Sequence, residues 1–121
     1  MLVVEDHEDA RAMLLMALEA IGYSARGVAD AEAALEIVSD YHPHAILIDL
    51  SLPRMNGYEL ARALRARRPP CSATLIAFTG HPSAGAEFED FDRYIVKPVR
   101  LEDLANLLAD ACDTGSHERP V

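Results

Sequence analysis

Acidic residues directly follow two short apolar runs, and they are the residues of this chain best suited to bind a ligand or take part in a reaction. Residues 1–4 lead into Glu5 and Asp6, and residues 45–48 lead into Asp49. Short apolar runs bounded by turn-forming residues are typical of strands that are covered on both faces of a parallel sheet. The carboxyl ends of such strands share one edge, which is where ligands bind. We therefore expect the three carboxylates to converge at one site.

Two further side chains are expected at the same edge. Thr79 follows the apolar run 73–78, and Lys97 follows the run 94–96. A site that offers carboxylate oxygens but no His or Cys ligand favours Mg²⁺. The three carboxylates, the ammonium of Lys97 and one Mg²⁺ together carry no net charge. A neutral group of this kind can admit a phosphoryl group, whose transfer requires positioning and charge neutralisation. Asp49 would be the nucleophile and would form an aspartyl-phosphate.

Helical patterns alternate with the predicted strands along the chain. The first pattern has apolar residues at a helical period, and they are Ala10, Met13, Leu14, Ala17, Leu18 and Ile21. Similar patterns occur at 31–38, where Asp30 is the expected N-cap, at 60–64 and at 101–112. A weaker strand pattern at 23–28 suits the edge of a sheet.

This alternation predicts an α/β fold, namely a doubly wound five-stranded parallel sheet with helices on both faces. The expected strand order is the flavodoxin-like order 2-1-3-4-5. The least regular segment is 81–92, where Pro82 and Gly85 indicate a short or irregular fourth helix. We assign residues 1–113 to the domain and 114–121 to a polar C-terminal tail.

Composition narrows the function classes. The chain has 121 residues, which suits one domain, and its net charge of -9 argues against direct nucleic-acid binding. We interpret the one basic cluster as a solvated helix face, and it comprises Arg62, Arg65, Arg67 and Arg68. No apolar run reaches the roughly 18 residues of a membrane span, so we expect a cytoplasmic protein without membrane contact. Cys71 and Cys112 are expected to be buried, reduced thiols.

Four segments, in this order, resemble the response-regulator receiver domains of two-component signalling. They are V-V-E-D-H after the first strand, D-L-S-L-P-R-M-N-G-Y-E-L from Asp49, F-T-G at the fourth strand and Y-I-V-K-P-V at the fifth. The longer segment F-D-R-Y-I-V-K-P-V is similar to the corresponding segment of receivers attached to hybrid histidine kinases. The resemblance covers essentially the whole chain.

The resemblance implies a specific reaction and metal site. Asp49 would accept a phosphoryl group from the phosphohistidine of a histidine kinase or a histidine phosphotransfer domain. Asp6 would ligate Mg²⁺ directly, Glu5 mostly through water, and Ser51 through its backbone carbonyl. Lys97 would pair with Asp49 and then with the phosphoryl group.

It also implies a conformational switch and a tuned phosphate lifetime. Thr79 would move to the phosphoryl oxygen, Tyr94 would turn inward behind it, and Ser51 and His81 would set how long the phosphate survives. The segment between Thr79 and Lys97 is shorter than is usual in the family, and Asp90 stands where a Gly is usual. These departures affect the face used for output and for a weak homodimer, and the downstream target is unknown.

Three alternative functions stay open at this point. A flavin or nucleotide binder requires a loop rich in Gly, Ser or Thr after the first strand, whereas this chain has an acidic one. A metal-dependent aspartyl phosphatase usually has a second acid two residues after the nucleophile, where Ser51 stands. A receiver used only for docking would not need the complete set of site residues.

Overall fold

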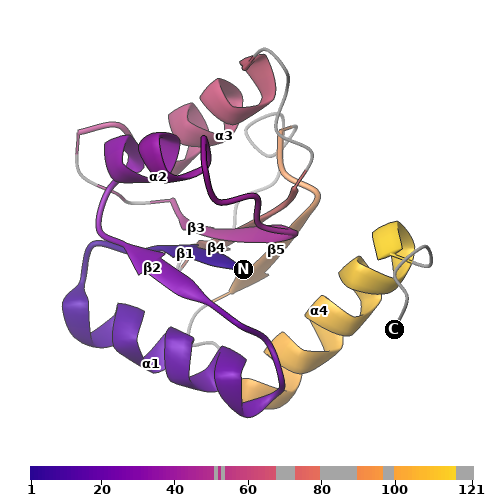
Figure 1. The fold of residues 1–121 in the computed structure, drawn as a ribbon. Helices are drawn as coiled ribbons and strands as arrows, with labels where there is room; N and C mark the ends of the chain where they lie inside the picture. Colours follow the sequence, from indigo (N-terminus) through magenta and orange to yellow (C-terminus); the bar gives the residue numbers. More distant parts are fainter. Residues whose placement is uncertain (51, 53, 68–72, 80–89, 97–99, 117–121) are drawn as a thin grey trace.

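Five parallel strands form one sheet with a layer of helices on each face (Figure 1). The computed structural model describes residues 1–50, 52, 54–67, 73–79, 90–96 and 100–116, apart from the side chains of 79 and 110–116. The strands are β1 (Leu2–Val4), β2 (Arg26–Val28), β3 (Ala45–Asp49), β4 (Thr74–Thr79) and β5 (Arg93–Val96). The helices are α1 (Glu8–Ala20), α2 (Ala31–Ile37), α3 (Gly57–Ala66) and α4 (Leu101–Ser116).

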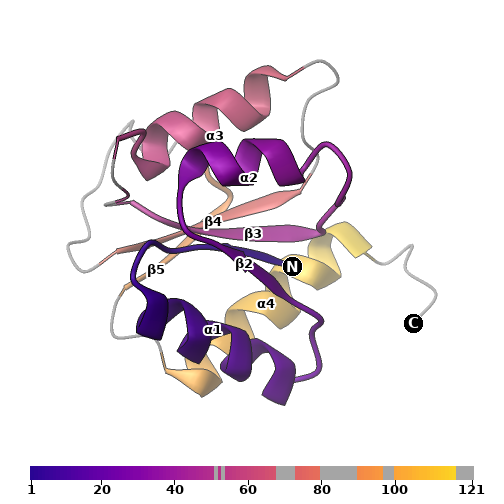
Figure 2. The ribbon, with the colours of Figure 1, turned by 60° about the vertical axis from the view of Figure 1, so that its left-hand side comes forward.

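The strand order is β2-β1-β3-β4-β5, which confirms the predicted topology. Helices α2 and α3 cover one face, and α1 and α4 cover the other (Figure 2). Along β3, Ile46 and Ile48 pack in the core beneath α2 and α3, whereas Ala45 and Leu47 pack in the opposite core. The strand is therefore buried on both faces, which explains its continuous apolar sequence.

Helix α1 differs from its predicted packing at one position. Leu14 and Leu18 are buried as expected, but Met13 is 70% exposed, so its assignment to the core stripe is wrong. Met13 and Leu15 flank Leu14 at about 100° on either side. The helix turns Leu15 toward the sheet, where Gly27 leaves room: a Cβ atom at Gly27 would lie 3.1 Å from Leu15 Cδ1.

Side-chain caps fix the starts of α2 and α3. The carboxylate of Asp30 accepts the backbone N–H of Ala33 at 2.7 Å, which confirms the predicted N-cap. Asn56 and Glu59 form a reciprocal capping box, with bonds of 3.0 Å and 2.9 Å. Both caps follow strands at the edge that carries Asp49, so they fix the direction in which the chain leaves this edge.

Several element boundaries differ from the sequence prediction. Strand β2 is shorter than the predicted 23–28, and α4 extends to Ser116, into the segment that we expected as a tail. Leu101, expected in the apolar stripe of the last helix, is 47% exposed. The predicted short helix falls mainly on residues 80–89, which lie outside the described residues, as do the side chains of both cysteines.

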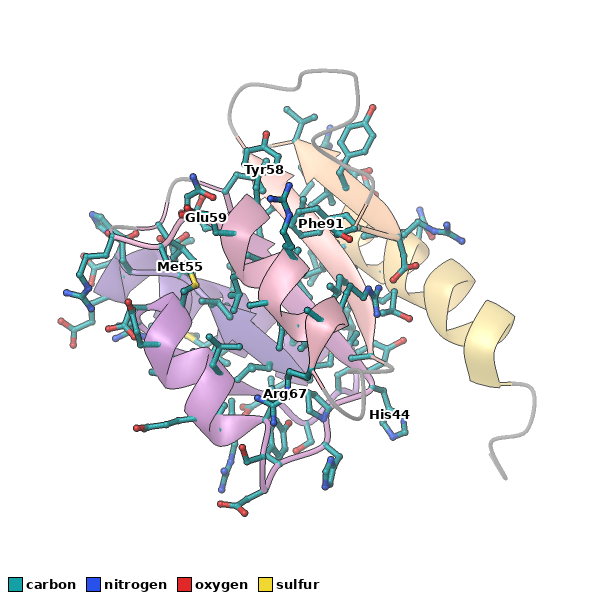
Figure 3. The ribbon with its side chains drawn as sticks, turned by 90° about the horizontal axis from the view of Figure 1, so that it is seen from above. His44, Met55, Tyr58, Glu59, Arg67 and Phe91 are labelled. Carbon is teal, nitrogen blue, oxygen red and sulfur yellow. The ribbon has the colours of Figure 1, made fainter. Side chains whose placement is uncertain are left out.

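The basic cluster of α3 is not a plain solvated face. Arg65 donates to the carbonyl of Ala73 at 3.1 Å and forms an ion pair with Asp92 at 2.7 Å. Arg67 donates to the carbonyl of Leu35, on α2, at 3.2 Å. In Figure 3, Arg67 lies at the C-terminal end of α3. These arginines join α3 to its neighbours, because their long side chains reach carbonyl groups at the ends of adjacent elements.

Candidate functional site

Glu5, Asp6 and Asp49 come together at the carboxyl ends of β1 and β3. The two strands pair with Val4 opposite Ile48, so Glu5 and Asp49 are the next residues on each side. One carboxylate oxygen from each of the three acids lies within 4.8 Å of the others. The predicted convergence is therefore confirmed, and it follows from strand register.

The three acids differ in exposure. Glu5 is 1% exposed and Asp49 is 3% exposed, whereas Asp6 is exposed. Burying charged carboxylates costs free energy unless cations or hydrogen bonds compensate for the lost water. The cluster thus combines two buried acids, Glu5 and Asp49, with one acid that is exposed to solvent, Asp6.

The segment after β1 is held by several hydrogen bonds. The backbone N–H of Glu5 donates to the carbonyl of Val28 at 3.1 Å, and its carboxylate accepts the N–H of His7 at 3.0 Å. The guanidinium of Arg11, on α1, donates to the backbone carbonyl of Glu5 at 2.9 Å. These contacts fix both the main chain and the side chain of Glu5 at the entrance to α1.

Leu50, the residue directly after β3, is fixed by the close approach of α3. The N–H of Leu50 donates to the carbonyl of Phe78 at 3.3 Å, and the N–H of Gly57 donates to the carbonyl of Leu50 at 3.3 Å. A Cβ atom at Gly57 would lie 2.7 Å from the carbonyl oxygen of Asp49 and 2.8 Å from Leu50 Cα. Glycine is therefore required for α3 to begin directly against the end of β3.

The other predicted site residues are described only in part. Thr79 ends β4 and pairs with Val96 of β5, so its backbone lies at the same sheet edge, but its side chain is not described. Tyr94 lies on β5 and is 52% exposed. Ser51, His81 and Lys97 lie outside the described residues.

Sequence reasoning missed Arg11 as a residue of this site. Arg11 lies within the acidic start of α1, where the sequence offers only the dipole preference for acids as a guide. A long side chain at this position can return to the preceding loop. Its direction depends on what lies opposite, and that is known only from the fold.

The donor chemistry of the cluster fits magnesium. Three carboxylates supply only oxygen, and Mg²⁺ binds few protein carboxylates while keeping several waters. The exposed Asp6 leaves one side of the cluster open to those waters and to a ligand. Among the described residues, this is the group of acids, histidines and cysteines that is close enough to hold a metal ion.

Comparison with known families gives a match over most of the chain. The family described as the response regulator receiver domain matches residues 1–109. The two-component response regulator PhoP of Pseudomonas aeruginosa is 37% identical over 111 residues, covering 86% of this chain and 47% of PhoP. The chain thus spans less than half the length of that curated relative.

Solved receiver domains have the same fold. A response regulator receiver domain from Methylobacillus flagellatus is 32% identical with a TM-score of 0.84, covering 91% of this chain and 95% of that chain. The receiver domain of a sensor histidine kinase from Pseudomonas aeruginosa is 27% identical with a TM-score of 0.84, covering 93% and 95%. That domain was solved with a magnesium ion coordinated in its active-site cleft.

The described part of this chain contains no helix with the length and apolar composition of a membrane span.

Proposed function

Because this chain belongs to the response regulator receiver family of two-component signalling, we propose that Asp49 is its phosphoacceptor. A receiver is a signalling phosphoacceptor rather than an enzyme, and receivers interact with histidine kinases. The observation that carries the proposal is the grouping of Glu5, Asp6 and Asp49 within 4.8 Å. Asp49 is the last residue of β3, the middle strand of the sheet, and ligands bind at the carboxyl ends of parallel strands. The family resemblance assigns the phosphoacceptor role to Asp49 and the metal-binding roles to Asp6 and Glu5.

In the proposed reaction, a carboxylate oxygen of Asp49 attacks the phosphorus of a phosphohistidine. The new O–P bond forms as the N–P bond breaks, and the imidazole nitrogen of the donor keeps the electron pair. Mg²⁺, when bound, neutralises charge on the phosphoryl oxygens. We assign its ligands to Asp6, Asp49 and the carbonyl of Ser51, with Glu5 acting mainly through water.

The remaining residues are assigned by the family resemblance. Lys97 pairs with Asp49 and then with the phosphoryl group, whose negative charge it partly neutralises. Thr79 donates its hydroxyl to a phosphoryl oxygen, and Tyr94 then turns inward. Since Tyr94 is 52% exposed here, that movement would bury a large ring and bias the population toward the active state. Ser51 and His81 tune the phosphate lifetime.

The proposed partners follow from the same chemistry. The donor is a histidine kinase or a histidine phosphotransfer domain, and we place the exchange in the cytoplasm. The net charge of -9 disfavours direct nucleic-acid binding by this domain. A weak homodimer and a downstream protein target are compatible with the exposed residues of β5. We propose that the receiver domain comprises residues 1–113, although α4 continues beyond it to Ser116.

The direct test is phosphoryl uptake from a small phosphoryl donor, such as acetyl phosphate, followed by intact mass spectrometry. The chain should gain one phosphoryl group when Mg²⁺ is present and none when a chelator removes it. Asp49→Asn should abolish uptake because the amide is not a nucleophile, and Asp6→Asn should slow it strongly. Asp40→Asn, an exposed acid away from the cluster, is the matched control and should react normally.

The same experiment distinguishes the alternatives. Continuous phosphate release from the donor, without a stable adduct, would indicate a phosphatase. Absence of uptake by the unaltered chain with Mg²⁺ would contradict the proposal, as would equal uptake by Asp49→Asn.

A further inference from the structure

We infer that Arg11 is a positioning residue that fixes the backbone from which Glu5 and Asp6 project, so that magnesium affinity depends on it. This inference rests on the proposed function and extends it to a residue that does not touch the reacting groups. Arg11 lies on α1, half-buried, between the acidic loop and the edge strand β2.

The contact reaches the peptide that links the two acids. Arg11 Nη1 donates to the carbonyl oxygen of Glu5 at 2.9 Å, and this carbonyl belongs to the Glu5–Asp6 peptide. The peptide is planar, so rotation of the carbonyl also rotates the N–H of Asp6 and displaces its Cα. The backbone N–H of Arg11 donates to the carbonyl of His7 at 2.9 Å, which anchors the arginine within the first turn of α1. A single side chain therefore ties the helix to the orientation of both acids.

The stem of Arg11 occupies space that a glycine leaves free. A Cβ atom at Gly27 would lie 2.9 Å from Arg11 Cγ and 3.0 Å from Arg11 Cδ. The methylene groups of Arg11 thus lie directly over the backbone of β2, where any side chain would displace them. Gly27 pairs in register with Val3, two residues before Glu5, so the support belongs to the same part of the sheet.

The loss of the Arg11 side chain should change magnesium affinity in opposite directions, depending on whether its charge or its contact with Glu5 has the larger effect. A guanidinium near a cation site repels Mg²⁺, so removal of its charge alone should strengthen magnesium binding. If Arg11 holds the acids in place, its removal should weaken binding, because partners that orient metal ligands commonly contribute about 10-fold or more to affinity. The sign of the change therefore separates the two roles.

The experiment is magnesium titration by calorimetry, together with the backbone amide NMR spectrum of the magnesium-free protein. Arg11→Gln should weaken magnesium binding by about 10-fold and shift the amide signal of His7, whose N–H donates to the Glu5 carboxylate. Gly27→Ala retains every charge and should weaken binding in the same direction by displacing the arginine stem. Combined, the two changes should be clearly less than additive, because they disrupt one contact. Arg62→Gln, at an exposed arginine of α3, is the matched control and should leave the magnesium affinity and the His7 amide signal unchanged.

The outcomes distinguish failure of the positioning role of Arg11 from failure of the proposed phosphoacceptor function. Unchanged or tighter magnesium binding in Arg11→Gln, with an unmoved His7 amide, would overturn the positioning role and leave the proposed function standing. If Arg11→Gln does not fold, Gly27→Ala decides: binding as tight as in the unaltered chain overturns the inference. Failure of the unaltered chain to bind magnesium would overturn this inference and the proposed function together.

Discussion

Gly57 shows how one residue at the site serves both stability and geometry. It begins α3 and brings the helix into contact with the backbone of Asp49 and Leu50. The atoms that a Cβ would meet are a carbonyl oxygen and a Cα, neither of which can move without bending β3 or the loop after it. A side chain at this position would therefore disturb the proposed phosphoacceptor through its main chain.

Gly57→Ala is predicted to destabilise the protein by about 1–3 kcal/mol, as overpacking does. The gain in helix propensity from Ala is about 1 kcal/mol, and it offsets only part of the clash. Urea unfolding measures the loss, and the amide NMR signals of Asp49 and Leu50 should shift.

Gly22→Ala is a matched control for this substitution. Gly22 has φ +98°, and a Cβ atom there would meet no atom of a residue beyond its two chain neighbours within 4 Å, so alanine costs free energy only through its backbone conformation. The control should be destabilised while the signals of Asp49 and Leu50 stay in place. Equal stability of Gly57→Ala and the unaltered chain would show that the helix can retreat from β3.

At the scale of the elements, Asp92, which precedes β5, holds this edge strand of the sheet in place. Its carboxylate accepts the N–H of Leu75 at 2.9 Å and the guanidinium of Arg65 at 2.7 Å, and its own N–H donates to the carbonyl of Leu75 at 2.8 Å. Asp92 thus joins β5 to β4 and to α3 at once. Tyr58 and Phe91 add an edge-to-face ring contact, with centroids 6.4 Å apart (Figure 3).

Asp92→Ala should destabilise the protein by about 1–2 kcal/mol, because it removes the partner of a partly buried backbone N–H. Hydrogen exchange should show that β5 loses protection before β3 does. Glu102→Ala, on α4, removes an exposed ion pair with Arg100, which precedes the helix, and should cause no measurable change. Uniform loss of protection across the sheet would contradict a role for Asp92 specific to β5.

The sequence predicted the order of the elements better than their contacts. Apolar runs followed by acids place Glu5 and Asp49 together, because parallel strands in register bring their ends to one edge. Long side chains were not predictable in this way. Arg65 and Arg11 reach carbonyl groups whose positions depend on elements distant in the chain, and Met13 is exposed because the rotation of α1 depends on the space at Gly27.

At the scale of the whole molecule, we predict that the acid cluster couples folding to the binding of the proposed magnesium ion. Two buried carboxylates and a third beside them repel one another in the folded state, whereas they are far apart in the unfolded chain. A cation that binds only the folded cluster stabilises the protein by mass action. Stability should therefore depend on magnesium, and on the number of acids in the cluster.

Magnesium at about 100 times its Kd should raise the free energy of unfolding by about 2.7 kcal/mol. Asp49→Asn should be more stable than the unaltered chain when no magnesium is present, and it should lose most of the response to magnesium. Glu19→Gln, at an exposed acid of α1, is the control and should keep the full response. Thermal unfolding with Mg²⁺ and with a chelator provides the comparison, and an undiminished response in Asp49→Asn would contradict the link.

The central claim is that the acid at the end of β3 carries the phosphoryl group, and peptide mapping tests it most directly. After reaction with acetyl phosphate and Mg²⁺, borohydride reduces an aspartyl-phosphate to homoserine, which marks the modified residue permanently. Proteolysis and tandem mass spectrometry should then find homoserine at position 49 alone. Homoserine or stable phosphate at any other residue, with position 49 unmodified, would contradict the account.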